Sequence, residues 1–151
     1  MDAGRIHCFL VSTRGGDVIY ERFFDRFTEL EKAEIRAAFS TASNNVRMPV
    51  NQEQDFIAPY KLTRFAFIPV ADTVFYLLGS GEYDEVGLVE VLRVIIQVLK
   101  DVLGKVPSPG LMLDKYSKVA LVVDEVINEG LLEAVDKEAI KKGIKGKAAW
   151  E

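Results

Sequence analysis

The chain has 151 residues, of which 23 are acidic and 19 are basic, giving a formal net charge of −4. This length suits one domain, and the acidic balance argues against nucleic acid as the main partner, because phosphate backbones bind basic surfaces. Hydrophobic residues make up 49% of the sequence and charged residues 28%, which is typical of a globular domain with a full core.

The first 24 residues predict a β-hairpin. Residues 5–13 and 17–24 read as strands, and Gly15 and Gly16 between them tolerate the positive φ of a tight turn. The alternative is a glycine-rich phosphate loop, but the lysine and the following helix of such a loop are missing. The plain hairpin is therefore the prediction.

A helix is predicted over Thr28–Thr41 and a loop after it. Thr28 is a suitable N-cap, and Glu31 three residues later completes a capping-box pattern. The polar segment Ser43–Gln54 contains Pro49 and reads as a mobile loop.

Three short extended runs follow the loop, at residues 55–62, 64–72 and 73–80. Pro59 and Pro69 in the first two favour sheet edges or strand ends. The third run and the first strand of the chain are apolar on both alternations and lack proline. We therefore place these two in the middle of a sheet that is covered on both faces.

The second half of the chain predicts helices over Asp84–Leu103 and Asp114–Glu129, and a short C-terminal helix over Asp136–Lys145. Most of the first helix must be covered, because its polar residues form one narrow stripe. That stripe consists of Glu90, Arg93, Gln97, Lys100 and Asp101. Strands joined by short turns imply a five-stranded antiparallel sheet with helices on both faces, an α+β fold.

The adjacent carboxylates Asp124 and Glu125 are candidates for a catalytic pair. Helical periodicity places both on the polar face of their predicted helix, whereas a catalytic pair needs an apolar pocket and a neighbouring base, nucleophile or metal. The single cysteine, Cys8, and the single histidine, His7, cannot supply a Cys/His zinc site or an internal disulfide. We therefore predict no enzyme, no metal, no cofactor and no small-molecule substrate.

The predicted order of two strands, a helix, three strands and two helices is that of the longin-type fold. The motif KVALVVDEVINEGLLE at residues 118–133 resembles the clathrin-adaptor sigma chains and coatomer zeta. The motifs EYDE (82–85), KDVLGKVP (100–107) and LDKY (113–116) look most like the small subunit of the TSET/TPLATE coat complex. This resemblance covers nearly the whole chain and is weakest in the loop 43–54.

The resemblance implies that residues 1–151 form a single longin-type domain that serves as a non-enzymatic coat subunit. Its partners would be a large adaptor trunk subunit and other coat subunits in endocytic traffic. No signal peptide or apolar run of about 18 residues is evident, so we expect a cytoplasmic protein that reaches the membrane only through the complex. The alternatives are a coatomer zeta-type subunit of Golgi traffic and a longin module that regulates a small GTPase.

Partner contacts are expected on two helices. Leu121 interrupts the polar face of the helix that carries the acidic pair. A single exposed leucine is common, but it can also anchor a partner, in which case Leu121→Asp would weaken assembly and leave the domain folded. Arg93 and Gln97 on the polar stripe of the preceding helix are the other candidates.

The first hairpin is the remaining candidate surface. Sigma chains that bind acidic dileucine signals carry a basic residue shortly after this hairpin, where the present chain has Ile19, so the resemblance implies no cargo site there. Arg14 and Arg22 flank the hairpin and are the residues that could substitute. The C-terminal lysines are open to two interpretations, contact with anionic lipid or a solvated helix end. They are Lys137, Lys141, Lys142, Lys145 and Lys147.

Overall fold

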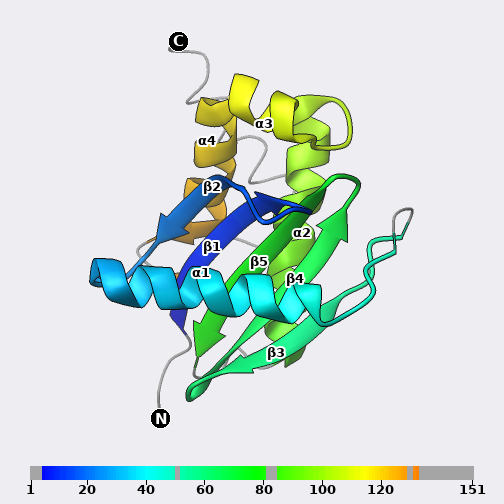
Figure 1. Cartoon of the computed structure of the whole chain (residues 1–151). Coiled ribbons are helices and arrows are strands. Elements are labelled where there is room, and N and C mark those ends of the chain that lie inside the picture. The colour runs from blue at the N-terminus through cyan, green and yellow to red at the C-terminus, as the bar shows by residue number, and fades with distance from the viewer. Residues whose placement is uncertain (1–4, 50–51, 81–84, 129–130, 133–151) are drawn as a thin grey trace.

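The computed structural model describes residues 5–49, 52–80, 85–128 and 131–132 (Figure 1). The long strands are β1 (Arg5–Thr13), β2 (Val18–Phe23), β3 (Phe56–Tyr60), β4 (Thr63–Val70) and β5 (Thr73–Ser80). The helices are α1 (Glu29–Asn44), α2 (Glu85–Leu103), α3 (Pro109–Asp114) and α4 (Tyr116–Val126). The two-residue strands β6 (Ile127–Asn128) and β7 (Leu131–Leu132) pair with each other after α4.

The five long strands form one antiparallel sheet in the order β2-β1-β5-β4-β3. The strands β1 and β5, which are apolar on both alternations and lack proline, are adjacent and lie inside the sheet, as predicted. Pro59 lies in the edge strand β3, and Pro69 is the second-last residue of β4, beyond the part that pairs with β3. Both prolines therefore occupy the edge or end positions that their missing N–H group favours.

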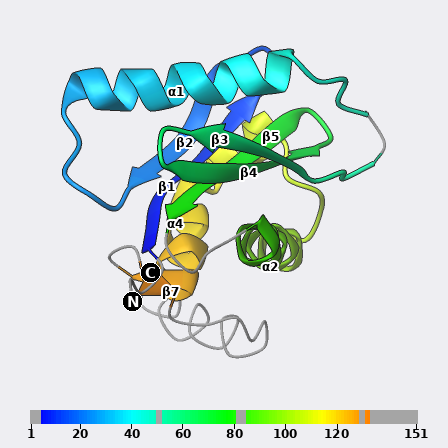
Figure 2. The same cartoon turned by 90° about the horizontal axis from the view of Figure 1, so that it is seen from below.

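Helices cover both faces of the sheet, with α1 on one face and α2 and α4 on the other (Figure 2). The core is divided in the same way. One cluster lies beneath α1 and includes Phe39, Phe65 and Phe67. A larger cluster joins the opposite face of the sheet to the helices α2 and α4, with Leu92 and Val123 fully buried in it. The prediction of a sheet covered on both faces is confirmed.

The first turn of α1 is fixed by the predicted capping box. The hydroxyl of Thr28 accepts a hydrogen bond from the backbone N–H of Glu31 at 3.1 Å, and the carboxylate of Glu31 accepts one from the backbone N–H of Thr28 at 2.9 Å. The hydrogen bond from the Thr28 backbone lowers the pKa of the Glu31 carboxyl, because it stabilises the ionised form. The helix continues to Asn44, three residues beyond the predicted end.

The helix predicted to start near Asp114 is α4, which starts at Tyr116, but the separate short helix α3 before it was not predicted. The structure begins α3 at Pro109, because Ser108 caps this end and accepts a hydrogen bond from the N–H of Leu111 at 3.2 Å. Proline suits the first helical position, where its missing N–H is not needed. Lys115, with φ −109° and ψ 34°, then separates α3 from α4.

The predicted end of this helix, at about Glu129, is three residues too late. The helix α4 ends at Val126, because Ile127 has the extended conformation (φ −127°, ψ 120°) and begins the strand β6. The helical periodicity of the sequence continues past Val126, so no local pattern indicated that a strand begins at Ile127. The predicted helix 136–145 and the C-terminal lysines lie outside the described residues.

Cys8 is fully buried on the α1 side of the sheet, and this burial raises the pKa of its thiol well above the ordinary value. The folded state therefore keeps the thiol proton at a pH where the unfolded chain loses it. We expect the contribution of Cys8 to the free energy of unfolding to be complete below about pH 8.5 and to fall by up to about 1.4 kcal/mol per pH unit above it. Urea denaturation measures the free energy of unfolding at pH 7 and at pH 10. This free energy should fall less between the two pH values for Cys8→Ala than for the wild type, and an equal fall would contradict this assignment.

Candidate partner-binding site

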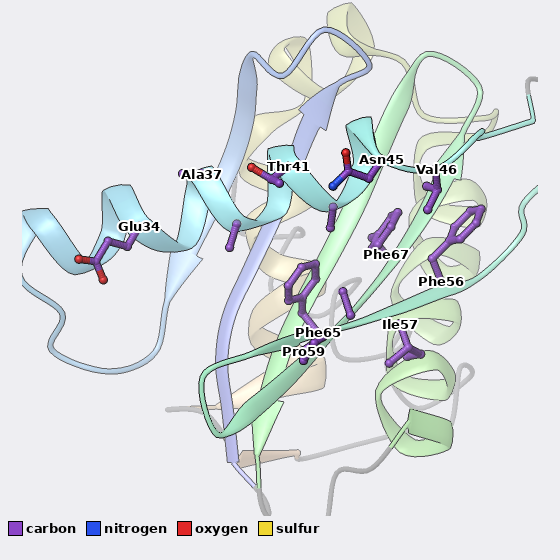
Figure 3. Close-up of a pocket in the computed structure, with 13 residues that line it drawn as sticks. Glu34, Ala37, Thr41, Asn45, Val46, Phe56, Ile57, Pro59, Phe65 and Phe67 are labelled. Atoms are coloured by element: carbon purple, nitrogen blue, oxygen red, sulfur yellow. The ribbon is translucent and has the colours of Figure 1, made fainter.

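An open groove of about 670 Å³ lies between α1 and the strands β3 and β4 (Figure 3). The rings of Phe56, Phe65 and Phe67 line it from the sheet, and the Phe56 and Phe67 rings stack with their centroids 5.0 Å apart. The space exists because α1 faces this side with small residues, among them Ala38 and Ala42. Burial of apolar side chains of a partner would be favourable here.

The groove carries little net charge. Glu34 is the charged residue of its lining, and its carboxylate pairs with the ammonium group of Lys61 at 3.3 Å. Lys61 belongs to the tight turn between β3 and β4, where it adopts a positive φ of 53°. An apolar segment can therefore enter the groove without desolvating an unpaired charge on this side.

The two edge strands of the sheet, β2 and β3, differ in the charged side chains that they carry. On the edge strand β2, Glu21 pairs with Arg36 of α1 and Arg22 pairs with Asp124 of α4, so ion pairs link this edge to the helices on both faces. Charged side chains on an edge discourage contact with another chain. The edge strand β3 has the sequence FIAPY, with no charged residue, and its Pro59 supplies no N–H for strand pairing. The β3 side is thus the better surface for an apolar partner.

The predicted polar location of the acidic pair is confirmed. Asp124 is partly exposed and accepts a hydrogen bond from Arg22, whose guanidinium also lies 5.5 Å from the centroid of the Phe24 ring. Arg22 is therefore neutralised by Asp124 rather than presented as a free cation. Ile19 is only 8% exposed and belongs to the core cluster on the α2 and α4 side, so position 19 does not offer a surface charge site.

Arg14 holds together three connecting segments. Its Nε donates to the carbonyl of Ala71 at 2.6 Å, and its Nη2 donates to the carbonyl of Pro49 at 2.9 Å. A longer hydrogen bond of 3.4 Å joins Nη1 to the carbonyl of Met48. The side chain thus connects the first hairpin to the β4–β5 turn and to the loop after α1, which gives Arg14 a structural role.

We expect Arg14→Ala to lower the free energy of unfolding by about 1–2 kcal/mol, because several carbonyls lose a charged donor. Arg14→Lys should lose nearly as much, since an ammonium group cannot reproduce the planar fork of a guanidinium. Urea denaturation measures both values. A partner-binding role would instead leave the stability of both variants unchanged and reduce assembly.

Leu121 is not the exposed residue that was predicted. It is partly buried and packs against the core cluster beneath α2 and α4. The reason is that α4 buries more of its circumference than the polar face suggested, with Val119, Val122, Val123 and Val126 all fully buried. Leu121→Asp would therefore disturb packing as well as any contact with a partner.

Arg93 and Gln97 lie on the polar stripe of α2, as predicted. Arg93 donates to the carboxylate of Asp55 at 2.6 Å and to the carbonyl of Glu53 at 3.4 Å, whereas Gln97 donates to Asp101 at 3.2 Å. The structure brings Arg93 together with the segment before β3. It places Arg14, Arg22 and Leu121 on other parts of the molecule.

His7 forms a network that had no signal in the sequence. It is the extra residue of a β-bulge in β1; its Nδ1 contacts the carboxylate of Asp25 and its Nε2 lies 2.6 Å from the Ser80 hydroxyl. This order resembles a hydrolase triad. However, Asp25 also accepts a hydrogen bond from Arg5, and the 210 Å³ cavity beside His7 is not lined by Ser80. We therefore assign the network a structural role in joining β1, the β2–α1 connection and the end of β5.

The described residues show neither a membrane-spanning helix nor a cluster of three or more His, Cys, Asp or Glu side chains placed to hold a metal ion. The model of the clathrin adaptor complex small chain family matches residues 5–149. The chain belongs to this family. The adaptor small chain is also 23% identical over 137 residues to the TSET complex member tstD of Dictyostelium discoideum, a match that covers 90% of this chain and 89% of that protein.

Two structural matches agree with this assignment. The adaptor small chain aligns with a chain in a homology model of the full-length AP-3 complex in a stretched open conformation, with a TM-score of 0.69 at 12% identity over 96% of this chain and 95% of the other. A chain of that complex in an intermediate open conformation gives a TM-score of 0.56 at 12% identity, over 85% of this chain and 31% of the other. At this identity the likeness concerns the fold, and the predicted longin-type α+β fold is confirmed.

Proposed function

We propose that this adaptor small chain is a core subunit of a TSET-like coat complex, bound to a large trunk subunit and acting in endocytic traffic. The observation that carries this proposal is the likeness to a TSET complex member, which extends over 90% of the chain and coincides with the family match. The chain would reach the cytoplasmic face of the membrane through the complex. Its own role would be architectural rather than catalytic.

The groove between α1 and β3 is the surface we propose for the large subunit. It is apolar, it opens beside the uncharged edge strand β3, and its one charged lining residue, Glu34, is already paired. An apolar segment of the large subunit would occupy it. The opposite edge of the sheet, with its ion pairs on both faces, is less suited to such a contact.

Co-expression with candidate large subunits from the same organism tests this proposal. We expect the chain to form a stable 1:1 complex with the TSET-type large subunit in size-exclusion chromatography with light scattering. Binding to a coatomer large subunit instead would move the chain to the zeta-type alternative. Binding to a small GTPase and to neither large subunit would support the regulatory alternative.

A further inference from the structure

A short acidic segment of the chain lies against the polar stripe of α2. We call residues Gln52–Asp55 the acidic strap; it leads directly into β3. Its Asp55 carboxylate accepts a hydrogen bond from Arg93 at 2.6 Å, and its Glu53 carboxylate pairs with Lys100. Two carboxylates in the strap thus match two cations on the helix.

Without the strap, these two cations would form a line of positive charge along α2. Arg93 and Lys100 are seven residues apart, which is about two helical turns and roughly 10 Å along α2. Gln97 lies between them on the same polar stripe. Gln97 is uncharged and donates to Asp101, so we give the name α2 cationic stripe to Arg93 and Lys100 alone. The strap meets these two cations with carboxylates at alternate positions of the chain, Asp55 and Glu53.

The strap is weakly held. The side chains of Arg93 and Asp55 are 46% and 45% exposed, and those of Lys100 and Glu53 are 24% and 35% exposed. Ion pairs of this exposure contribute little to stability and are screened by salt. Another acidic segment can therefore replace the strap without a large loss, because each carboxylate that leaves is exchanged for a similar one.

We propose that the α2 cationic stripe binds an acidic, extended segment of the large subunit, and that the acidic strap occupies this surface until that segment displaces it. The proposal rests on the proposed function for the identity of the partner. Its physical basis is charge complementarity, since the chain's own carboxylates already occupy the stripe. The strap would reduce the affinity of competing acidic segments and make binding dependent on ionic strength.

The test uses the purified chain and a fluorescent peptide that copies the strap, with the sequence NQEQDF. In Glu53→Gln/Asp55→Asn the internal carboxylates are replaced by isosteric neutral amides, so both ion pairs with the stripe are lost. We expect this variant to bind the peptide at least tenfold more tightly than the wild type in low salt, as measured by fluorescence anisotropy. Adding Arg93→Ala and Lys100→Ala should abolish the gain.

The matched control is Glu29→Gln/Asp17→Asn, which changes the net charge equally but at exposed positions of α1 and of the turn between β1 and β2. Equal affinity of the strap variant and this control would overturn the proposal, as would unchanged binding after removal of Arg93 and Lys100. The peptide experiment does not involve the large subunit. A failure of the wild type to assemble with any large subunit would therefore overturn the proposed function. The peptide result tests separately whether the acidic strap occupies the α2 cationic stripe.

Discussion

Substituting alanine for Gly79 should lower the free energy of unfolding by about 1–3 kcal/mol, because it overpacks the contact between β5 and α2. A Cβ atom at this position would lie 2.6 Å from Leu88 Cδ2 and 3.3 Å from the carbonyl oxygen of Arg5. Leu88 is fully buried, so its side chain has little room to move away. Urea denaturation monitored by circular dichroism measures the loss.

Gly110→Ala is the matched control for this prediction. No atom lies within 4 Å of a Cβ added at Gly110, so this substitution in α3 should be neutral or stabilising by up to about 1 kcal/mol. Combining Gly79→Ala with Leu88→Ala should cost less than the sum of the two single changes, because the smaller side chain makes room for the new methyl group. A neutral Gly79→Ala would show that α2 does not pack as closely on β5 as described.

Filling the groove should prevent assembly while leaving the domain folded. Ala42 lines the groove from α1, so the indole of Ala42→Trp would occupy the space proposed for the large subunit. We expect the affinity for the large subunit to fall at least tenfold, which corresponds to about 1.4 kcal/mol. Isothermal titration calorimetry with the purified large subunit measures the change.

Ala33→Trp provides the control for the groove variant. Ala33 is an exposed residue of the same helix and does not line the groove, so it adds the same side chain elsewhere. We expect this variant to bind like the wild type, and both variants to keep the circular dichroism spectrum of the parent. Wild-type affinity of a folded Ala42→Trp variant would exclude the groove as the contact surface.

The sheet and its coverage could be predicted because the signals are local. The absence of proline and the continuous apolar character of β1 and β5 indicated central strands, and Thr28 with Glu31 indicated the start of α1. The end of α4 could not be predicted, since a helical pattern continues past Val126 and tertiary packing decides where it stops. Ser108 followed by Pro109 is a signal for the start of a helix, but the sequence prediction placed no helix there.

The candidate site was less predictable, because its contacts join residues far apart in the chain. Arg14 was taken for a partner residue, yet its carbonyl acceptors lie 34 to 57 positions away. Arg93 was placed correctly on a polar stripe, but its partners come from the end of the loop expected to be mobile, at Glu53, and from the start of the next extended run, at Asp55. The groove could not be predicted either, since small residues in α1 leave space only once the helix lies against Phe56 and Phe67.

The central claim is that this chain is a subunit of a TSET-like coat complex. The most direct measurement is affinity purification of the tagged full-length chain from its own cells, followed by quantitative mass spectrometry. We expect a large adaptor subunit, a medium chain and further TSET-type subunits in amounts equal to that of the tagged chain. Recovery of coatomer subunits, or of a small GTPase or a second longin chain without any large adaptor subunit, would contradict this claim.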